Sequence, residues 1–187
     1  MLMLIDAGRI ARRTPPEALV HAIEAQFRRG CHMPVRHHHE IQVAGEPDGV
    51  MLLMPAWDDH GHLGVKIANI FPGNSDRGEP AVSAVYLLMD GRTGRPQALL
   101  DGSELTARRT AGTSALAARY LARRDTQRML MVGTGRLARQ LIRFHKTLLP
   151  QLSVSAWGRT PENVRKLIED MAQEGIEVRY AQDLRRA

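Results

Sequence analysis

Cysteine and aromatic residues are scarce in this sequence, and each shortage narrows the range of functions. With the single cysteine Cys31, no disulfide can form within one chain, so we expect a reducing, cytoplasmic environment. Aromatic residues make up 4% of the chain, which leaves few platforms on which single-stranded nucleic acids could stack. No apolar run approaches the roughly 20 residues of a membrane-spanning helix, and the apolar run at the N-terminus is too short for a secretory signal. We therefore expect a soluble protein with neither nucleic-acid nor membrane partners.

Positive charge, by contrast, is in excess: 26 lysines and arginines face 20 acidic residues, which gives a net charge of +6 at pH 7. A single basic tract would suggest a polyanionic partner. Here the arginines are dispersed in pairs, at Arg12-Arg13, Arg28-Arg29, Arg108-Arg109, Arg123-Arg124 and Arg185-Arg186. We interpret most of this charge as solvated surface, with a few arginines reserved for anionic ligands.

The first two thirds of the chain predict a helix followed by a sheet. Thr14-Pro15-Pro16-Glu17 is typical of a helix start, with Thr14 as the N-cap, and Gly30 is a natural stop. Alternating apolar residues separated by turn signals then predict strands near residues 35–43, 50–56, 63–70, 81–88 and 97–100. Five successive strands with short connections indicate an antiparallel or mixed sheet.

The last third changes pattern. After an alanine-rich helix over residues 103–123, strands at 128–132, 152–157 and 176–180 alternate with helices at 135–148 and 161–174. This order predicts the first βαβαβ half of a doubly wound, Rossmann-type parallel sheet. The predicted fold is therefore α/β: an N-terminal α+β domain over residues 1–124, and a partial parallel-sheet domain over residues 125–187.

The junction between the first of these strands and its helix carries a G-x-G-x-x-A pattern. Gly133 permits a tight turn, Gly135 lets the backbone approach phosphates, and Ala138 allows close packing of helix on strand. The N–H groups and the dipole of the helix start provide an anion site. We expect a dinucleotide to bind here, at Gly133, Thr134, Gly135, Arg136, Leu137 and Ala138.

The end of the second strand predicts which dinucleotide is bound. An NAD site places an acidic residue there to bind the ribose 2′-hydroxyl. This chain instead has Arg159 followed by Thr160, and an arginine suits a 2′-phosphate by its charge and its forked geometry. NADP(H) is therefore favoured, with NAD(H) as the alternative. The competing interpretation is that Arg159 is simply an exposed arginine at a helix start, with no role in cofactor choice.

Three cations and a histidine run are further candidates in the first domain. Lys66 lies in an apolar strand, where a charge is costly without a partner, so either a small anionic substrate or solvent faces it. Arg36 and Arg109 also fall in predicted regular elements. His37 and His39 would share one strand face and His38 the other. Without a matching cysteine or carboxylate spacing, we expect no metal site.

The chain resembles the ornithine cyclodeaminase/mu-crystallin family from about residue 1 to residue 180. Its most specific part is the segment from Leu99-Leu100-Asp101-Gly102 to Arg109-Thr110, together with the glycine turn. The matching stretches are Met33-Pro34-Val35-Arg36, Leu53-Met54-Pro55-Ala56, Gly64-Val65-Lys66, Phe71-Pro72-Gly73-Asn74, Tyr86-Leu87-Leu88-Met89-Asp90, Thr93-Gly94, Ala98-Leu99-Leu100-Asp101-Gly102, Leu105-Thr106, Arg109-Thr110, Ser114-Ala115 and Val132-Gly133-Thr134-Gly135.

The resemblance implies a homodimer with an N-terminal substrate-binding and dimerisation domain and a nucleotide-binding domain. It also implies that Arg36 and Arg109 bind the carboxylate of a small amino or imino acid, and that Lys66 is catalytic near the imine nitrogen. The expected activity is NAD(P)-dependent reduction of a cyclic imino acid such as Δ1-pyrroline-2-carboxylate. Two alternatives stay open: conversion of ornithine to proline and ammonia, and a non-catalytic ligand-binding member. Because the family's chains are longer, we expect a C-terminally truncated member.

Overall fold

The computed structural model describes residues 1–184, so the pair Arg185-Arg186 lies outside the described residues. The chain separates into two compact units. The first contains Met1–Arg13 and Ala25–Thr106, and the second contains Thr14–Glu24 and residues from Ala107 onward. These units follow contacts within the chain, and the division of binding roles at residue 124 stays a prediction. Within residues 1–184, no helix has the length and apolar character to cross a membrane.

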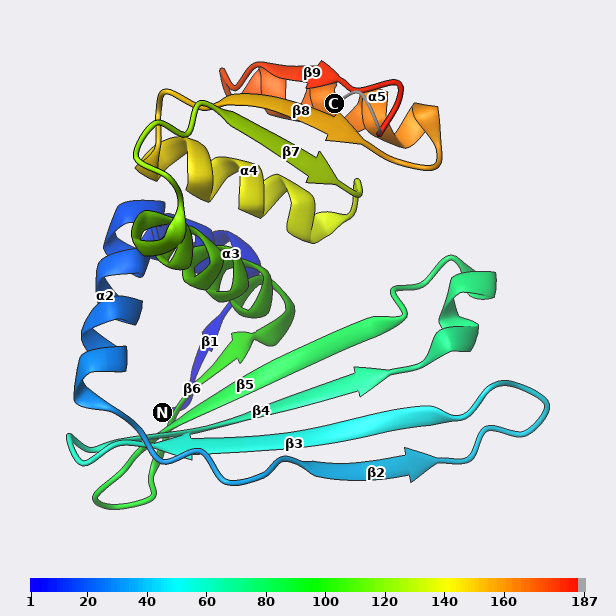
Figure 1. Cartoon of the computed structure of the whole chain (residues 1–187). Helices are drawn as coiled ribbons and strands as arrows, with labels where there is room; N and C mark the ends of the chain where they lie inside the picture. The colour runs from blue at the N-terminus through cyan, green and yellow to red at the C-terminus, as the bar shows by residue number, and fades with distance from the viewer. Residues whose placement is uncertain (185–187) are drawn as a thin grey trace. The chain divides into compact units, whose positions relative to one another are not determined.

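The first unit is built on a six-stranded sheet (Figure 1). Its strands run in the spatial order β1-β6-β5-β4-β3-β2, with β1 parallel to β6 and every other neighbouring pair antiparallel. The sequence predicted an antiparallel or a mixed sheet, and the sheet is mixed. Their bounds are β1 (Met3–Ile5), β2 (His37–Ile41), β3 (Gly49–Trp57), β4 (His62–Ile70), β5 (Val82–Asp90) and β6 (Pro96–Asp101).

Three short elements escape the sequence prediction. Strand β1 and helix α1 (Ala7–Arg13) lie in a segment where no element was expected, and the turn at Pro72 winds into the short 3-10 helix η1 (Pro72–Arg77). Strand β1 has three residues, too few for a visible alternation. It forms because Leu4 pairs with Leu99 on β6, a partner nearly the whole unit away in sequence.

The two faces of this sheet differ in burial. On the face that carries Lys66, here called the lysine face, Ala68 and Ala98 are buried. The reverse face includes the polar pair Asn69 and Ser83, but several of its apolar residues remain accessible. Val85, Trp57 and Leu4 there have 40%, 41% and 67% of their surface exposed.

The second unit contains a three-stranded parallel sheet in the order β7-β8-β9, which confirms the predicted half of a doubly wound fold. Its strands are β7 (Arg128–Val132), β8 (Ser153–Trp157) and β9 (Val178–Tyr180), with helices α4 (Arg136–Leu148) and α5 (Pro161–Gln173) between them. Valine and leucine side chains of β8 and α5 meet residues of α4 in one core, made of Ala138, Ile142, Val154, Ala156, Val164, Leu167, Met171 and Val178.

A second core of this unit joins parts of two helices that span the boundary between the units, α2 (Pro16–Arg29) and α3 (Gly102–Leu121). Val20, Ala111 and Ala115 pack with the fully buried ring of Phe144. A Cβ on Gly112 would come within 2.9 Å of Ile23 and 3.3 Å of Phe144. The small residues of α3 therefore permit close packing of this helix against its neighbours.

The start of α2 departs from the prediction. The helix begins at Pro16, and Thr14 is not its N-cap residue. Instead, the hydroxyl and the carbonyl oxygen of Thr14 accept hydrogen bonds from the guanidinium of Arg108, whose residue is 4% exposed. A buried guanidinium needs acceptors more than a helix start needs a cap, because an unpaired buried charge costs several kcal/mol whereas a missing cap costs about 1 kcal/mol.

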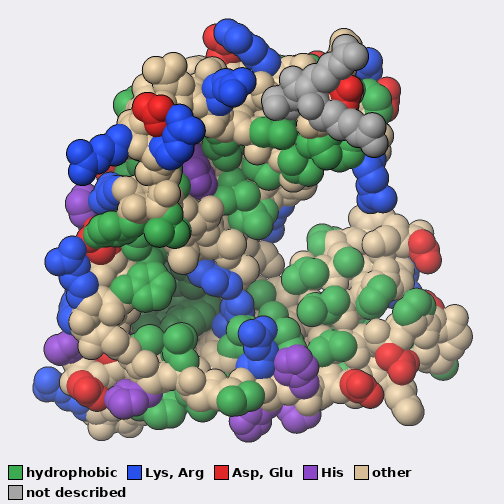
Figure 2. Space-filling view, in the orientation of Figure 1, with side chains coloured by type: hydrophobic (Ala, Val, Ile, Leu, Met, Phe, Trp, Pro, Cys, Tyr) green, Lys and Arg blue, Asp and Glu red, His purple; other side chains and the backbone are tan. Residues whose placement is uncertain are grey.

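Basic side chains lie at several separate places on the face shown in Figure 2, with acidic side chains among them. Ion pairs such as Arg123–Asp125 and Arg165–Glu162 are exposed to solvent. Such pairs contribute at most about 1 kcal/mol each, so they keep the surface solvated and do little to hold the fold.

Candidate functional site

The turn between β7 and α4 has the conformation that its glycines were expected to allow. Gly133 has a φ of +109°, a region that favours glycine, and its N–H donates to the carbonyl oxygen of Trp157 at 2.8 Å. Gly135 is the N-cap residue of α4. The positive end of the helix dipole and the first N–H groups of α4 therefore meet at this loop.

The loop leaves room for a ligand's phosphates. A Cβ built on Gly133 or on Gly135 meets no heavy atom within 4 Å, so the surface beside both glycines is open. Ala138, by contrast, is 4% exposed and belongs to the core between helix and sheet. Open backbone at the glycines and close packing at the alanine are the two features that a pyrophosphate-binding turn requires, and the residues present fit such a group.

The end of β8 lies against this loop. A Cβ on Gly158 would come 2.9 Å from Cγ2 of Thr134, so the Thr134 side chain packs where Gly158 has none. Arg159 and Thr160 follow directly and are exposed, and Thr160 occupies the N-cap position of α5 without a side-chain capping bond. The structure thus brings together the glycine loop and the strand end that the sequence paired for a dinucleotide.

Lys66 occupies the middle of β4, half-buried, with Met54 and Tyr86 as its partners on the neighbouring strands. A Cβ on Gly64 would collide with the hydroxyl of Tyr86, so the tyrosine lies over this glycine on the lysine face. Burial raises the pKa of the Tyr86 hydroxyl. Tyr86 therefore stays protonated next to Lys66 in the sheet, a polar neighbour that sequence reasoning did not single out.

The two predicted carboxylate-binding arginines are exposed. Arg36 directly precedes β2, in which His37 pairs with Leu53, the residue before Met54. Arg109 projects from α3 in the second unit, one residue after the buried Arg108. Each arginine is placed within its own unit, and their joint binding of one carboxylate stays a prediction.

The histidine run alternates as expected. The rings of His37 and His39 are 6.5 Å apart on one face of β2, and His38 pairs with Leu52 on the lysine face. Within the part of the chain that the structure describes, no group of three or more His, Cys, Asp or Glu side chains could hold a metal ion.

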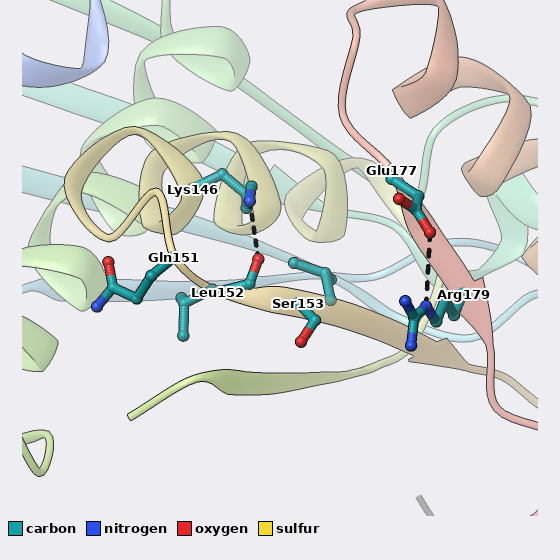
Figure 3. Close-up of a pocket in the computed structure, with 7 residues that line it drawn as sticks. Lys146, Gln151, Leu152, Ser153, Glu177 and Arg179 are labelled. Atoms are coloured by element: carbon teal, nitrogen blue, oxygen red, sulfur yellow. Dashed lines mark hydrogen bonds and ion pairs between the residues drawn. The ribbon is translucent and has the colours of Figure 1, made fainter. Parts of the chain in front are cut away.

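A cavity of about 180 Å³ lies at the opposite, amino-terminal end of β8 (Figure 3). Its two cations are paired within the chain. Lys146 Nζ donates to the carbonyl oxygens of Pro150 and Leu152 at 2.8 Å, and Arg179 pairs with Glu177 at 3.5 Å. Ligands of parallel sheets bind at the carboxyl ends of the strands, so we interpret this cavity as structural.

The family follows from comparison with known proteins. A model described as the ornithine cyclodeaminase/mu-crystallin family matches residues 3–187. The chain belongs to this family. The resemblance seen in the short sequence stretches is thereby confirmed.

Three relatives show how much of the family's chain is present. An uncharacterised protein of Schizosaccharomyces pombe is 38% identical over 159 residues, which are 83% of this chain and 48% of that protein. A Δ1-pyrroline-2-carboxylate reductase of Paracoccus denitrificans is 35% identical over 93% of this chain and 52% of its own. The structure of the Thermococcus litoralis Δ1-pyrroline-2-carboxylate reductase in complex with NADH and L-proline superposes with a TM-score of 0.85 at 28% identity, over 99% of this chain and 58% of that one. The chain therefore spans about half the length of the curated relatives it matches.

Proposed function

We propose that this family member takes part in the NADPH-dependent reduction of a cyclic imino acid of the Δ1-pyrroline-2-carboxylate type. The observation that carries the proposal is the open glycine loop at Gly133 and Gly135 packed against the strand end at Gly158. The similarity to two Δ1-pyrroline-2-carboxylate reductases supports the substrate class. The single cysteine leads us to assign the protein to the cytoplasm.

The cofactor is a nicotinamide dinucleotide, which supplies a hydride when it is bound. The glycine loop would hold its pyrophosphate, and exposed Arg159 would bind a 2′-phosphate through its forked donors. The structural relative was solved with NADH. The choice of NADP(H) over NAD(H) therefore rests on Arg159 and not on that relative. The test compares the dissociation constants of NADPH and NADH for the native chain and for Arg159→Asp. We expect the native chain to bind NADPH more tightly than NADH, and Arg159→Asp to lose this preference. Equal affinities of the native chain for NADPH and NADH would contradict the assignment of NADP(H).

The substrate roles fall to three cations. Arg36 and Arg109 would bind the carboxylate, each as a charge-assisted donor. Lys66, half-buried beside Met54 and Tyr86, would hold a proton near the imine nitrogen. Reduction adds a hydride to the imine carbon and a proton to its nitrogen, so Lys66 would supply that proton.

Dimerisation would use the reverse face of the six-stranded sheet. Apolar side chains exposed in a contiguous sheet face are typical of a protein interface, and Leu4, Trp57 and Val85 are among them here. A second copy of the chain would bury them with a matching face across a twofold axis.

Turnover decides between this activity and its alternatives. The full chain is incubated with NADPH and Δ1-pyrroline-2-carboxylate, and oxidation of NADPH with formation of proline is measured. We expect activity that Lys66→Met reduces strongly while NADPH still binds. Proline formed from ornithine without net cofactor use would instead indicate a cyclodeaminase, and NADPH binding without turnover of either substrate would indicate a ligand-binding protein.

A further inference from the structure

Arg139, on the first turn of α4, contacts the carbonyl oxygens of the glycine loop. Its Nη1 lies 3.3 Å from the carbonyl oxygen of Thr134 and 3.4 Å from that of Gly135. Its Nε donates to Oδ2 of Asp170 on α5 at 2.8 Å. One guanidinium thus joins both loop carbonyls to a carboxylate on the next helix.

The contact with Thr134 bears on which way the loop presents the N–H group of Gly135. In a trans peptide, the C=O and the following N–H point in opposite directions. Because the carbonyl of Thr134 is turned toward Arg139, the N–H group of Gly135 is turned away from it. The carbonyl of Gly135 is held by the helix as well, since it accepts from the N–H of Ala138 at 3.0 Å. N–H groups at the start of a helix are the ones that bind anions at such turns.

We propose that Arg139, held by Asp170, is a positioning residue that orients the N–H group of Gly135 toward the phosphates of the dinucleotide. The inference rests on the proposed function for its ligand, although the contacts are those of the chain alone. Arg139 touches no ligand atom in this proposal. It acts by restricting the peptide plane between Thr134 and Gly135 before the cofactor arrives, which lowers the entropic cost of binding.

The same two helices contain a matched control. Arg143, one turn further along α4, pairs with Glu174, the C-cap residue of α5, with its Nε 2.7 Å from Oε2. The side chains of the Arg139–Asp170 pair are 26% and 34% exposed, and those of the Arg143–Glu174 pair are 24% and 38% exposed. The two pairs are therefore alike in exposure. Arg143 also donates to Oε1 of Gln140 at 2.6 Å, and of the two arginines only Arg139 contacts the loop carbonyls.

The experiment compares Arg139→Gln with Arg143→Gln in the full chain. Both substitutions remove a half-buried ion pair between α4 and α5, so we expect similar decreases in thermal stability. NADPH is the probe for binding. We expect its dissociation constant to rise about tenfold for Arg139→Gln, the effect of one lost favourable interaction, and less than twofold for Arg143→Gln.

A second readout needs no ligand. Backbone order parameters of the Gly135 amide, measured by nuclear magnetic resonance in the cofactor-free chain, report motion of the Thr134–Gly135 peptide plane on the ps–ns timescale. We expect them to fall in Arg139→Gln and to stay unchanged in Arg143→Gln. Arg139→Lys is expected to keep most of the stability but not the order, since one ammonium cannot reproduce the fork.

The outcomes separate this inference from the proposed function. If the native chain binds neither NADPH nor NADH, the cofactor assignment is wrong, while the order parameters still test the positioning by Arg139. If both glutamine variants change the affinity and the order parameters equally, Arg139 is only a link between helices and the inference is overturned.

Discussion

The two units of this chain bury their apolar residues in opposite ways. The largest fully buried side chains, Phe144, Ile142, Leu167, Met171, Val20, Val154 and Val164, all belong to the second unit. In the first unit, the buried apolar residues are small or peripheral: Ile10, Ala68 and Ala98. A parallel sheet flanked by helices encloses its own core, whereas an antiparallel sheet can leave one face uncovered. The first unit therefore depends more on what covers its reverse face.

The unfolding of each unit can be measured separately, because each unit contains one of the two tryptophans. Trp57 lies in the first unit and Trp157 in the second. Variants that keep a single tryptophan make fluorescence a report on one unit. Urea unfolding of such variants is the common measurement for the stability predictions below.

The largest effect is expected from the core of the second unit. Phe144→Ala removes a ring with no exposed surface. It should lower the free energy of unfolding of the second unit by about 3–5 kcal/mol, as measured by the fluorescence of Trp157. Phe27→Ala in the first unit is the matched control, since 67% of Phe27 is exposed, and should change the stability by less than about 0.5 kcal/mol. A similar loss in both variants would refute the contrast.

A second pair of variants compares two adjacent arginines of α3. Arg108 is buried and hydrogen-bonded to Thr14 and Gln140, with its guanidinium carbon 5.4 Å from the centre of the Phe144 ring. Arg108→Met should lower the unfolding free energy of the second unit by about 2–3 kcal/mol, because the acceptors lose a charged donor. Arg109→Met should leave it within about 0.5 kcal/mol, and the proposed substrate binding should weaken instead.

A third prediction concerns the uncovered face of the first unit. Val85→Arg places a charge on the reverse face and should convert the proposed dimer to monomers, measured as molar mass by light scattering. Val82→Arg is the control on the lysine face, where Val82 is 56% exposed. If both variants keep the native mass, the reverse face is not the interface.

The smallest effect is a pH dependence confined to the first unit. The backbone N–H groups of Thr93 and Arg92, with the Thr93 hydroxyl, hold the pKa of Asp90 below its usual range. A carboxyl with a lowered pKa in the folded state stabilises the fold above the unfolded-state pKa of about 4, and that contribution is lost as the pH falls through the folded-state pKa.

Asp90→Asn should therefore flatten the decline of the Trp57 unfolding midpoint below about pH 4, and it should leave the Trp157 midpoint unchanged. The control in the second unit is Asp125→Asn, because the Arg123 side chain holds the pKa of Asp125 below its usual range. A change in both midpoints for Asp90→Asn would mean that the two units do not respond separately.

Much of this architecture was readable from local pattern. Apolar alternation and the glycines and prolines of the turns placed every strand from β2 to β9 within a few residues, because these signals act over one element. The glycine turn was also predicted from the sequence. The positive φ of Gly133 is a conformation that favours glycine, so the residue type itself marks the turn. The joint site of Arg36, Lys66 and Arg109 stays a prediction from the family resemblance.

The sequence by itself determined the order of the elements from α2 onward apart from η1, the glycine turn and the family. Only the tertiary structure decided that Arg108 is buried while its neighbour Arg109 is exposed, since successive helix residues point about 100° apart and packing selects the face. It alone brought β1 to β6 and Arg139 to the carbonyls of Thr134 and Gly135 and to Asp170. The pairings with β6 and with Asp170 join residues far apart in the chain, and the loop contacts depend on a side-chain conformation, so no local periodicity encodes them.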